Sequence, residues 1–422
     1  MASEASKERF DLRRLLASAE NASPIAAVHV LAGELAESLH ASHVSLLIAN
    51  FSGDAVVRLS HVSAGAELRD GHNERVESIP LVGPYKRVLW SQQLEVVHDG
   101  DEWVALVPVS ERGDAIGILE LSLQRQPDGV TVEHLHAAAH ALAYVLIASR
   151  RHTDLFEWAQ RDIPFSIAAE IQRRLLPSAY TAEGGPFTIA GWLEPSHSAG
   201  GDTFDYSIDR EHLYASITDA MGHSVEAAML ATLTVSTLRN SRRLLASPLE
   251  EANTANAGLK ANARDDQFVT GLLMRVRLAD GSVEVVNAGH PLPYLLRAGE
   301  PVSLPLRTEA PLGVQRGSYD AQAFQLQPGD RLLLITDGYL ERNAARIDIE
   351  SVLVEGRARH PRQVVQELAR NVLHVTGGKL RDDATAVCID WFGPSGTREA
   401  TGGASRARAT DLSDSTSPLA PR

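Results

Sequence analysis

The chain has little cysteine, no apolar leader and no long uninterrupted apolar run. A single cysteine among 422 residues cannot form an intramolecular disulfide, which excludes a small secreted fold held together by disulfides. The first 14 residues are charged and lack the apolar centre of a signal peptide. The nearest approach to a membrane span, residues 137–148, is interrupted by His140 and is shorter than the roughly 20 residues that cross a bilayer. We therefore expect a cytoplasmic protein with no membrane partner.

Positive charge is also scarce. The 40 Lys and Arg residues face 54 Asp and Glu residues, so the formal net charge is −14. Proteins that bind nucleic acid or anionic lipid through electrostatics need a cationic surface, so neither partner is expected. The composition, with 44 % hydrophobic and 22 % charged residues, is that of an ordinary globular protein. At about 150 residues per domain, the length indicates two or three domains.

Residues 22–148 have the pattern of an α+β domain with one antiparallel sheet, and residues 1–21 form an extension before it. Apolar residues at three- and four-residue spacing predict a helix over 25–39, and a second helix over 131–149 closes the domain. Strands are predicted at 43–48, 55–59, 103–109 and 115–123. This order resembles that of a GAF domain, which implies a sensor that takes a small-molecule or protein input.

Residues 149–182 carry apolar residues at helical spacing and predict a helical linker. Its apolar side either pairs with a second copy in a homodimer or packs on the chain's own domains. Residues 183–392 contain many short predicted strands and a few amphipathic helices, which favours two stacked antiparallel sheets flanked by helices. Residues 393–422 contain almost no large apolar residue and are predicted to be a disordered tail.

Four acidic motifs in the second domain lie at turns or at the ends of predicted strands. Several acids that converge at one edge of a sheet would repel one another unless a cation neutralised them. Oxygen ligands without His or Cys at metal-binding spacing favour Mg²⁺ or Mn²⁺ over zinc. Each motif alone also has an ordinary interpretation as a turn or a solvated loop. The motifs are Gly200-Gly201-Asp202, Thr218-Asp219-Ala220, Thr336-Asp337-Gly338 and Arg381-Asp382-Asp383.

In this order the motifs resemble the metal-dependent protein phosphatases (PPM, protein phosphatase 2C-like), in the bacterial branch named after stage II sporulation protein E. The resemblance covers residues 167–391. It implies an α-β-β-α sandwich and two Mn²⁺ or Mg²⁺ ions that activate water to hydrolyse phosphoserine or phosphothreonine, with no phospho-enzyme. Further matching segments are residues 171–177, Phe268-Val269-Thr270, Asn287-Ala288-Gly289-His290-Pro291 and Pro311-Leu312-Gly313.

The resemblance assigns roles residue by residue. Asp202 is expected to hold one ion, and Asp219 to bridge both ions as the central catalytic acid. The backbone carbonyl of Ala220 supports the first ion, and a carbonyl ligand does not depend on the side chain. Asp337 and Asp382 are expected to hold the other ion.

Three further residues lie near these motifs. Two of them have both a functional and a structural interpretation, and the third has a structural one. Asp383 either takes part in metal binding through water or is a solvated surface acid. His223 either protonates the leaving group, for which a histidine pKa suits, or satisfies local backbone groups. His290 is expected to fix a loop by hydrogen bonding and not to act in catalysis.

The branch also implies a substrate, the phosphorylated form of a STAS-type anti-sigma-factor antagonist in a partner-switching pathway. One alternative is a catalytically inactive scaffold that binds phosphoproteins, against which the complete set of acids argues. A second alternative is a diguanylate cyclase, because Gly200-Gly201-Asp202-Thr203-Phe204 resembles the GGDEF signature of those enzymes. Thr203 stands where that signature needs an acid, which argues against the cyclase.

Overall fold

A computed structural model describes residues 10–63, 77–161, 165–196, 200–222, 224–264, 266–340, 344, 347–378 and 380–395. The chain divides into two compact units. Described residues up to 161 belong to the first unit, and those from Phe165 onward belong to the second. The division falls within the predicted linker at 149–182.

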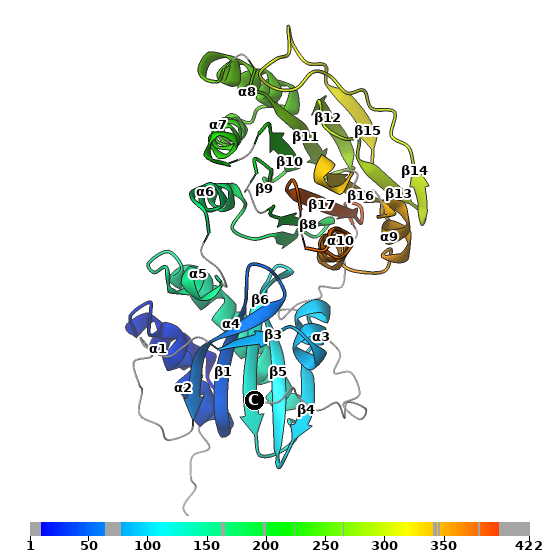
Figure 1. The fold of residues 1–422 in the computed structure, drawn as a ribbon. Coiled ribbons are helices and arrows are strands. Elements are labelled where there is room, and N and C mark those ends of the chain that lie inside the picture. Colours follow the sequence, from blue (N-terminus) through cyan, green and yellow to red (C-terminus); the bar gives the residue numbers. More distant parts are fainter. Residues whose placement is uncertain are drawn as a thin grey trace, which may run out of the picture. The chain divides into compact units, whose positions relative to one another are not determined.

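The first unit is built on a six-stranded antiparallel sheet with the strand order β3-β2-β1-β6-β5-β4 (Figure 1). Its strands are β1 (Ala41–Ala49), β2 (Ala55–Ser63), β3 (Ser78–Pro80), β4 (Glu95–Asp99), β5 (Glu102–Glu111) and β6 (Asp114–Leu123). Its helices are α1 (Leu12–Asn21), α2 (Ala27–Leu39), α3 (Gly83–Ser91), α4 (Gly129–Ser149) and α5 (Leu155–Ala159). The mixed α+β architecture predicted from the order of helices and strands is therefore present.

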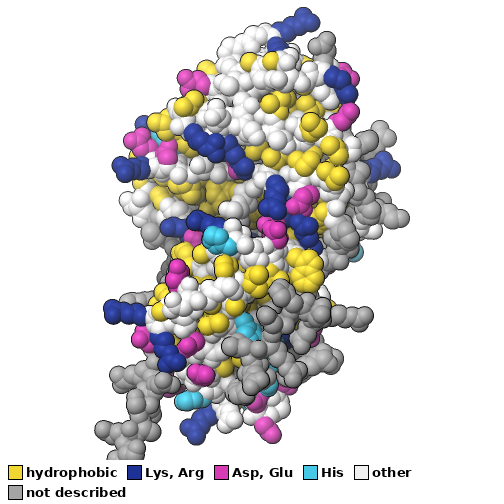
Figure 2. Space-filling model, turned by 90° about the vertical axis from the view of Figure 1, so that its left-hand side faces the viewer, with side chains coloured by type: hydrophobic (Ala, Val, Ile, Leu, Met, Phe, Trp, Pro, Cys, Tyr) yellow, Lys and Arg dark blue, Asp and Glu magenta, His cyan; other side chains and the backbone are white. Residues whose placement is uncertain are grey.

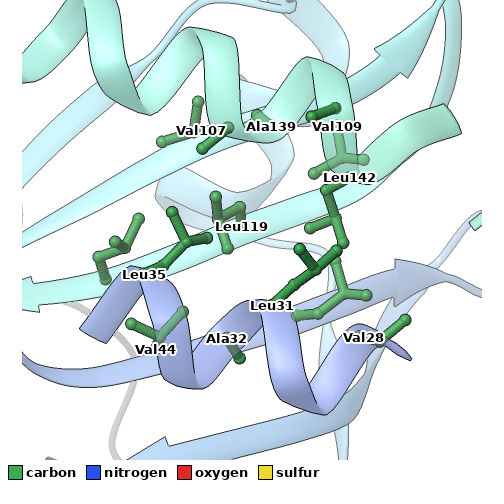
Figure 3. Close-up of a cluster of buried hydrophobic side chains, with 14 of the residues drawn as sticks. Val28, Leu31, Ala32, Leu35, Val44, Val107, Val109, Leu119, Ala139 and Leu142 are labelled. Atoms are coloured by element: carbon green, nitrogen blue, oxygen red, sulfur yellow. The ribbon is translucent and has the colours of Figure 1, made fainter. Parts of the chain in front are cut away.

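The side chains of this sheet alternate between two hydrophobic cores. Val44 of β1 lies in the core shared with α1, α2 and α4, whereas Leu47 lies in the core beneath α3. Figure 3 shows Leu31 and Leu35 of α2 facing Leu119 of β6 in the larger core. Each such leucine stabilises the fold by about 1.5–3 kcal/mol when it is fully buried.

Helix α4 has the length and the apolar composition of a membrane span. It runs for 21 residues, so the apolar run at 137–148 lies within a helix that is longer than the run itself. Its Leu135, Ala139 and Leu142 are nonetheless buried against the sheet of the first unit. These contacts are those of the core helix of a folded domain.

The second unit contains two antiparallel sheets, with the strand orders β15-β12-β11-β10-β9 and β14-β13-β16-β17-β8-β7. The strands are β7 (Thr181–Glu183), β8 (Phe187–Glu194), β9 (Thr203–Ile208), β10 (His212–Ala220), β11 (Val269–Arg277), β12 (Ser282–Ala288), β13 (Tyr294–Arg297), β14 (Glu300–Val302), β15 (Gln322–Gln325), β16 (Arg331–Ile335) and β17 (Ala384–Trp391). The helices are α6 (Ile167–Leu175), α7 (Ser224–Arg243), α8 (Pro248–Asn262), α9 (Ile349–Glu355) and α10 (Pro361–Thr376), with a 3₁₀ turn at Asp337–Tyr339.

Three hydrophobic cores separate four layers in this unit. One core lies between the two sheets, one between the β9–β12 sheet and helices α6–α8, and one between the other sheet and helices α9–α10. In β16, Leu332 and Leu334 face the central core, whereas Leu333 and Ile335 face α9 and α10. A strand buried on both faces reads as a continuous apolar run, as this one does. The predicted α-β-β-α sandwich is confirmed.

The predicted linker contains two short helices in the part that the structure describes. Helix α5 contributes Phe156 to the core of the first unit. Helix α6 packs on α7 in the second unit, where Ala168 and Ala228 are both buried. Residues 162–164 between these helices, and residues 396–422 of the predicted tail, lie outside the described residues.

Candidate metal centre

Strand ends bring the predicted acids to one end of the sandwich. Asp202 immediately precedes β9 and Asp219 is the penultimate residue of its antiparallel neighbour β10, where Thr203 is opposite Thr218. In the other sheet, β16 and β17 are also antiparallel neighbours. The segment with Asp337 follows the end of β16, and the segment with Asp382 and Asp383 precedes the start of β17.

Two threonine hydroxyl groups connect these pairs of strands across the sandwich. Thr336 Oγ1 and Thr385 Oγ1 each donate a hydrogen bond to Asp202 Oδ2 at 2.7 Å. Thr336 and Thr385 are fully buried, and Asp202 is nearly so. The segment before β9 is thereby tied to the segments that carry Asp337 and Asp382.

The acids act on one another electrostatically, as expected for a cluster. Burial raises the pKa of Asp219 to about 7, and the charges of Asp337 and Asp382 contribute to this rise. Burial and then the charge of Asp219 raise the pKa of Asp202 well above its usual value. Burial and the charge of Asp382 raise the pKa of Asp337. In the described part of the chain, none of these acids forms an ion pair with a Lys, Arg or His side chain.

Asp383 has a different environment from its neighbour Asp382. Its Oδ1 accepts a hydrogen bond from Ser196 N at 2.8 Å, and its Oδ2 accepts one from Gly200 N at 3.0 Å. The Gln172 side chain of α6 also donates to Oδ2. Asp383 is 1 % exposed, so its interpretation as a solvated surface acid is wrong. It shapes the loop before Asp202, and its metal-binding role stays a prediction.

Both glycines of the Gly-Gly-Asp motif are required by close approaches. A Cβ atom on Gly200 would lie 2.6 Å from Asp383 Oδ2, and one on Gly201 would lie 2.5 Å from the carbonyl oxygen of Ala220. Neither position has room for a side chain. The motif therefore brings the backbone of the loop close to Asp383 and to the predicted carbonyl ligand Ala220.

The two histidines have different outcomes. His290 is buried, its backbone N–H donates to Asn287 Oδ1 at 2.8 Å, and its Nδ1 lies 3.1 Å from Thr270 Oγ1. Burial lowers the pKa of His290 to about 4, so its ring is neutral near pH 7. The predicted loop-fixing role of His290 is confirmed. His223 lies outside the described residues.

The acid cluster suits a divalent cation in its chemistry. Its side-chain donors are all oxygens, which Mg²⁺ and Mn²⁺ prefer. No three His, Cys, Asp or Glu side chains in the described ranges are already arranged around a single point as a ligand set. Instead, Asp219 and Asp202 interact through a side-chain hydrogen bond. Two neighbouring carboxyl groups share a proton in this way when nothing else offsets their charge, and a divalent cation supplies the same neutralisation.

Three residues that contact the acids were not predicted to have a role. Gln172 donates to the backbone oxygen of Asp202 at 2.9 Å as well as to Asp383. Thr336 and Thr385 donate to the Asp202 carboxylate. All three lie inside motifs that the sequence comparison singled out, but a motif does not reveal which of its polar side chains points inward.

Comparison with known proteins gives a match to a family model in the second unit. Residues 209–392 match the family model of stage II sporulation protein E (SpoIIE). Asp219, Asp337 and Asp382 lie within the matched residues, and Asp202 precedes them.

Several solved structures are similar at low identity. One is the PP2C phosphatase domain, with a fragment of the regulatory domain, of SpoIIE from Bacillus subtilis (18 % identity, 50 % of this chain and 65 % of that chain, TM-score 0.44). Another contains the RsbU and RsbW domains of Rv1364c from Mycobacterium tuberculosis (21 %, 55 % and 65 %, TM-score 0.47). A third is the catalytic domain of the serine/threonine protein phosphatase PstP in complex with two manganese ions (18 %, 48 % and 97 %, TM-score 0.37). The chain thus spans slightly less than two thirds of the first two structures.

Proposed function

Because residues 209–392 match the family model of stage II sporulation protein E, we propose that the chain is a metal-dependent protein serine/threonine phosphatase. The observation that carries this proposal is the acid cluster itself. Asp202, Asp219, Asp337 and Asp382 come from both sheets, influence one another's charge, and have no cationic partner among the described residues. Asp202 is almost fully buried and Asp219 is half-buried, and a carboxylate in such a place is costly unless a cation offsets its charge.

Within this proposal, the acids hold two Mn²⁺ or Mg²⁺ ions. Asp219 interacts with each of the other acids and would contribute to holding both ions, Asp202 and the Ala220 carbonyl would hold one of them, and Asp337 and Asp382 would hold the other. Bound divalent ions lower the pKa of water and offset charge on a phosphoryl group. The chain's own part is to orient the carboxylates and to place the phosphate ester at this end of the sandwich. His223 is proposed to donate a proton to the departing serine or threonine oxygen.

For the substrate, we propose phosphoserine or phosphothreonine on a folded protein, a STAS-type anti-sigma-factor antagonist. Apolar side chains beside the acids support a protein substrate. Met221 and Leu340 follow Asp219 and Asp337 closely in the chain, and they are 38 % and 45 % exposed. Figure 2 shows other exposed hydrophobic side chains, interspersed with Lys and Arg, on one side of the molecule. An apolar margin adds contact with a protein that a small phosphate ester cannot make.

For regulation, we propose that the first unit acts as a GAF-like sensor whose input reaches the acid cluster through α6. Gln172 of α6 donates to Asp383 and to the backbone of Asp202. The C-terminal end of α6 is held by Arg239 of α7, which donates to the Leu175 carbonyl. A shift of α6 would therefore disturb the loop that carries Asp202. Pairing of two copies through the linker stays a prediction, as does the cytoplasmic location.

The direct test is a phosphate-release assay with and without manganese. The substrates are p-nitrophenyl phosphate, a phosphoserine peptide and a panel of phosphorylated antagonist proteins, and Asp219→Asn is the inactive control. The proposal predicts manganese-dependent release from all three classes, highest for one protein of the panel. Calorimetric manganese binding without release from any substrate would favour the phosphoprotein-binding scaffold. Formation of a cyclic dinucleotide from GTP would favour the cyclase.

A further inference from the structure

Asp202 is held by two hydroxyl groups on a single oxygen. Thr336 Oγ1 and Thr385 Oγ1 both donate to Oδ2 at 2.7 Å, and no N–H or hydroxyl group of a described residue donates to Oδ1. Both threonines are 0 % exposed, so neither hydroxyl group can exchange its partner for bulk water. Two donors on one oxygen fix the rotation of a carboxylate and leave its other oxygen directed elsewhere.

The two threonines are also bonded to each other. The backbone N–H of Thr336 donates to the Thr385 carbonyl, and the backbone N–H of Thr385 donates to Thr336 Oγ1, each at 3.0 Å. Thr336 immediately precedes Asp337, and Thr385 follows Asp382 by three residues. One hydrogen-bonded group therefore joins three acid-bearing segments, of which the Asp202 segment lies more than a hundred residues from the other two in the chain.

We propose that Thr336 and Thr385 are positioning residues, which orient the Asp202 carboxylate for a divalent cation and keep the three acid-bearing segments in register. The inference rests on the proposed function, because it concerns how the same acids bind their ion. Groups that hydrogen-bond a metal ligand generally change metal affinity by about 10–100-fold when they are removed.

Valine and serine variants separate the hydroxyl group from the shape of the side chain. Valine keeps the branched shape of threonine and removes the donor, whereas serine keeps the donor and removes a methyl group. Thr188→Val is a matched control, because Thr188 is 0 % exposed on β8, beside β17, and its hydroxyl group has no partner in the described part of the chain.

The experiment is a calorimetric titration of MnCl₂ into the full chain and into each variant, with thermal unfolding of the metal-free proteins as a check of folding. Thr336→Val and Thr385→Val are each expected to weaken manganese binding by about tenfold or more. Thr336→Ser, Thr385→Ser and Thr188→Val are expected to bind as the unmodified chain does. In the phosphate-release assay, the valine variants need more manganese for half-maximal rate but recover most of their kcat at saturation.

Several outcomes would overturn the inference. The inference is wrong if either valine variant folds and binds manganese with unchanged affinity. It is also wrong if the serine variants lose as much manganese affinity as the valine variants. Thr336 and Thr385 are each replaced in a separate variant. If one valine variant fails to fold, the manganese affinity of the other still tests the inference. An effect of Thr336→Val that persists undiminished in an Asp202→Asn background would show that the threonine does not act through Asp202. An unmodified chain that neither binds manganese nor releases phosphate would instead contradict the proposed function itself.

Discussion

The acids at the two ends of strands β16 and β17 differ in burial and in pairing: Asp390 is buried, whereas Asp337 is exposed and Asp382 is half-buried. At one end, Arg331 is directly opposite Asp390 and donates to it at 2.6 and 2.8 Å. At the other end, the strands meet Asp337 and Asp382, which have no cationic partner among the described residues. The sheet thus supplies its own cation where a buried carboxylate has a structural role. At the other end, the sheet supplies no such partner, and the charge of Asp337 and Asp382 is left to be offset by a cation from solution.

The same contrast recurs within β9. Asp205 lies three residues after Asp202 and is paired with Arg239 and Arg242 of α7. Asp202 has two hydroxyl donors and acidic neighbours instead. A buried carboxylate without a cation is costly. Asp202 is buried beside other acids and has no cationic partner among the described residues, which supports a cation-binding site there.

The largest effect is expected from Asp219→Asn. This change removes the acid that interacts with all the others, and it should reduce manganese-dependent phosphate release by about 100-fold or more. It also removes a repulsive charge, so the metal-free variant should unfold at a higher temperature than the unmodified metal-free chain. Phosphate release and thermal unfolding measure the two effects. Unaltered phosphate release would show that the acids at this end of the sandwich do not have the proposed role.

Asp390→Asn should have the opposite profile. Removing one member of a buried ion pair leaves Arg331 without its countercharge, which destabilises a protein by about 3–5 kcal/mol. Urea denaturation measures this loss in the free energy of unfolding. The manganese dependence of the folded variant should stay unchanged, because Asp390 lies at the end of β17 that does not carry the acid cluster. If the free energy of manganese binding changed by more than the free energy of unfolding, the two ends of β17 would not have separate roles.

The pH dependence should differ between metal-free and metal-loaded protein. The pKa of Asp219 is raised from 3.8 to about 7, so the folded metal-free chain binds more protons than the unfolded chain between these values. The contribution of Asp219 to the stability of the metal-free chain is therefore greatest at low pH and falls as the pH rises toward 7. Protons compete with manganese for the same carboxylate, so the stabilisation by manganese should grow over the same range. Thermal unfolding from pH 5 to 8, with and without MnCl₂, measures both slopes, and parallel slopes would contradict the account.

A smaller effect is expected from Gln172→Leu. The change keeps the size of the side chain but removes the donor to Asp383 and to the Asp202 backbone. Leaving a buried acceptor unsatisfied costs about 1–3 kcal/mol, so manganese affinity should fall by about tenfold. Arg174→Leu, on the exposed side of the same helix, is the control. If both variants bound manganese with equal affinity, the contacts of α6 would have no influence on the acid cluster.

The layered fold could be predicted because its main strands are long and strongly apolar. β5 and β6 lie where the apolar runs at 103–109 and 115–123 indicate. Short elements such as β14, β15 and α9 were missed, because a few residues carry too weak a periodic pattern. The helix α1 was missed as well, although its Leu15 and Ala19 are buried.

The acids of the candidate site could be named from the sequence, but their individual roles could not. Asp382 and Asp383 are adjacent and chemically identical. Their difference depends on Ser196 and Gly200, which reach Asp383 from almost two hundred residues away. The cluster around Asp202 likewise depends on hydrogen bonds that only the folded chain brings together. Motif order identified the chemistry, and tertiary contacts distinguished the acid that shapes the loop from the other acids.

The central claim is that a cation from solution neutralises the acidic end of the sandwich. Calorimetric titration of MnCl₂ into the full chain and into Asp219→Asn, at one pH near 7, tests it most directly. The account predicts saturable binding to the unmodified chain and at least a large loss of that binding in the variant. An unmodified, folded chain with no saturable manganese binding, or a variant that binds as well as the unmodified chain, would contradict it.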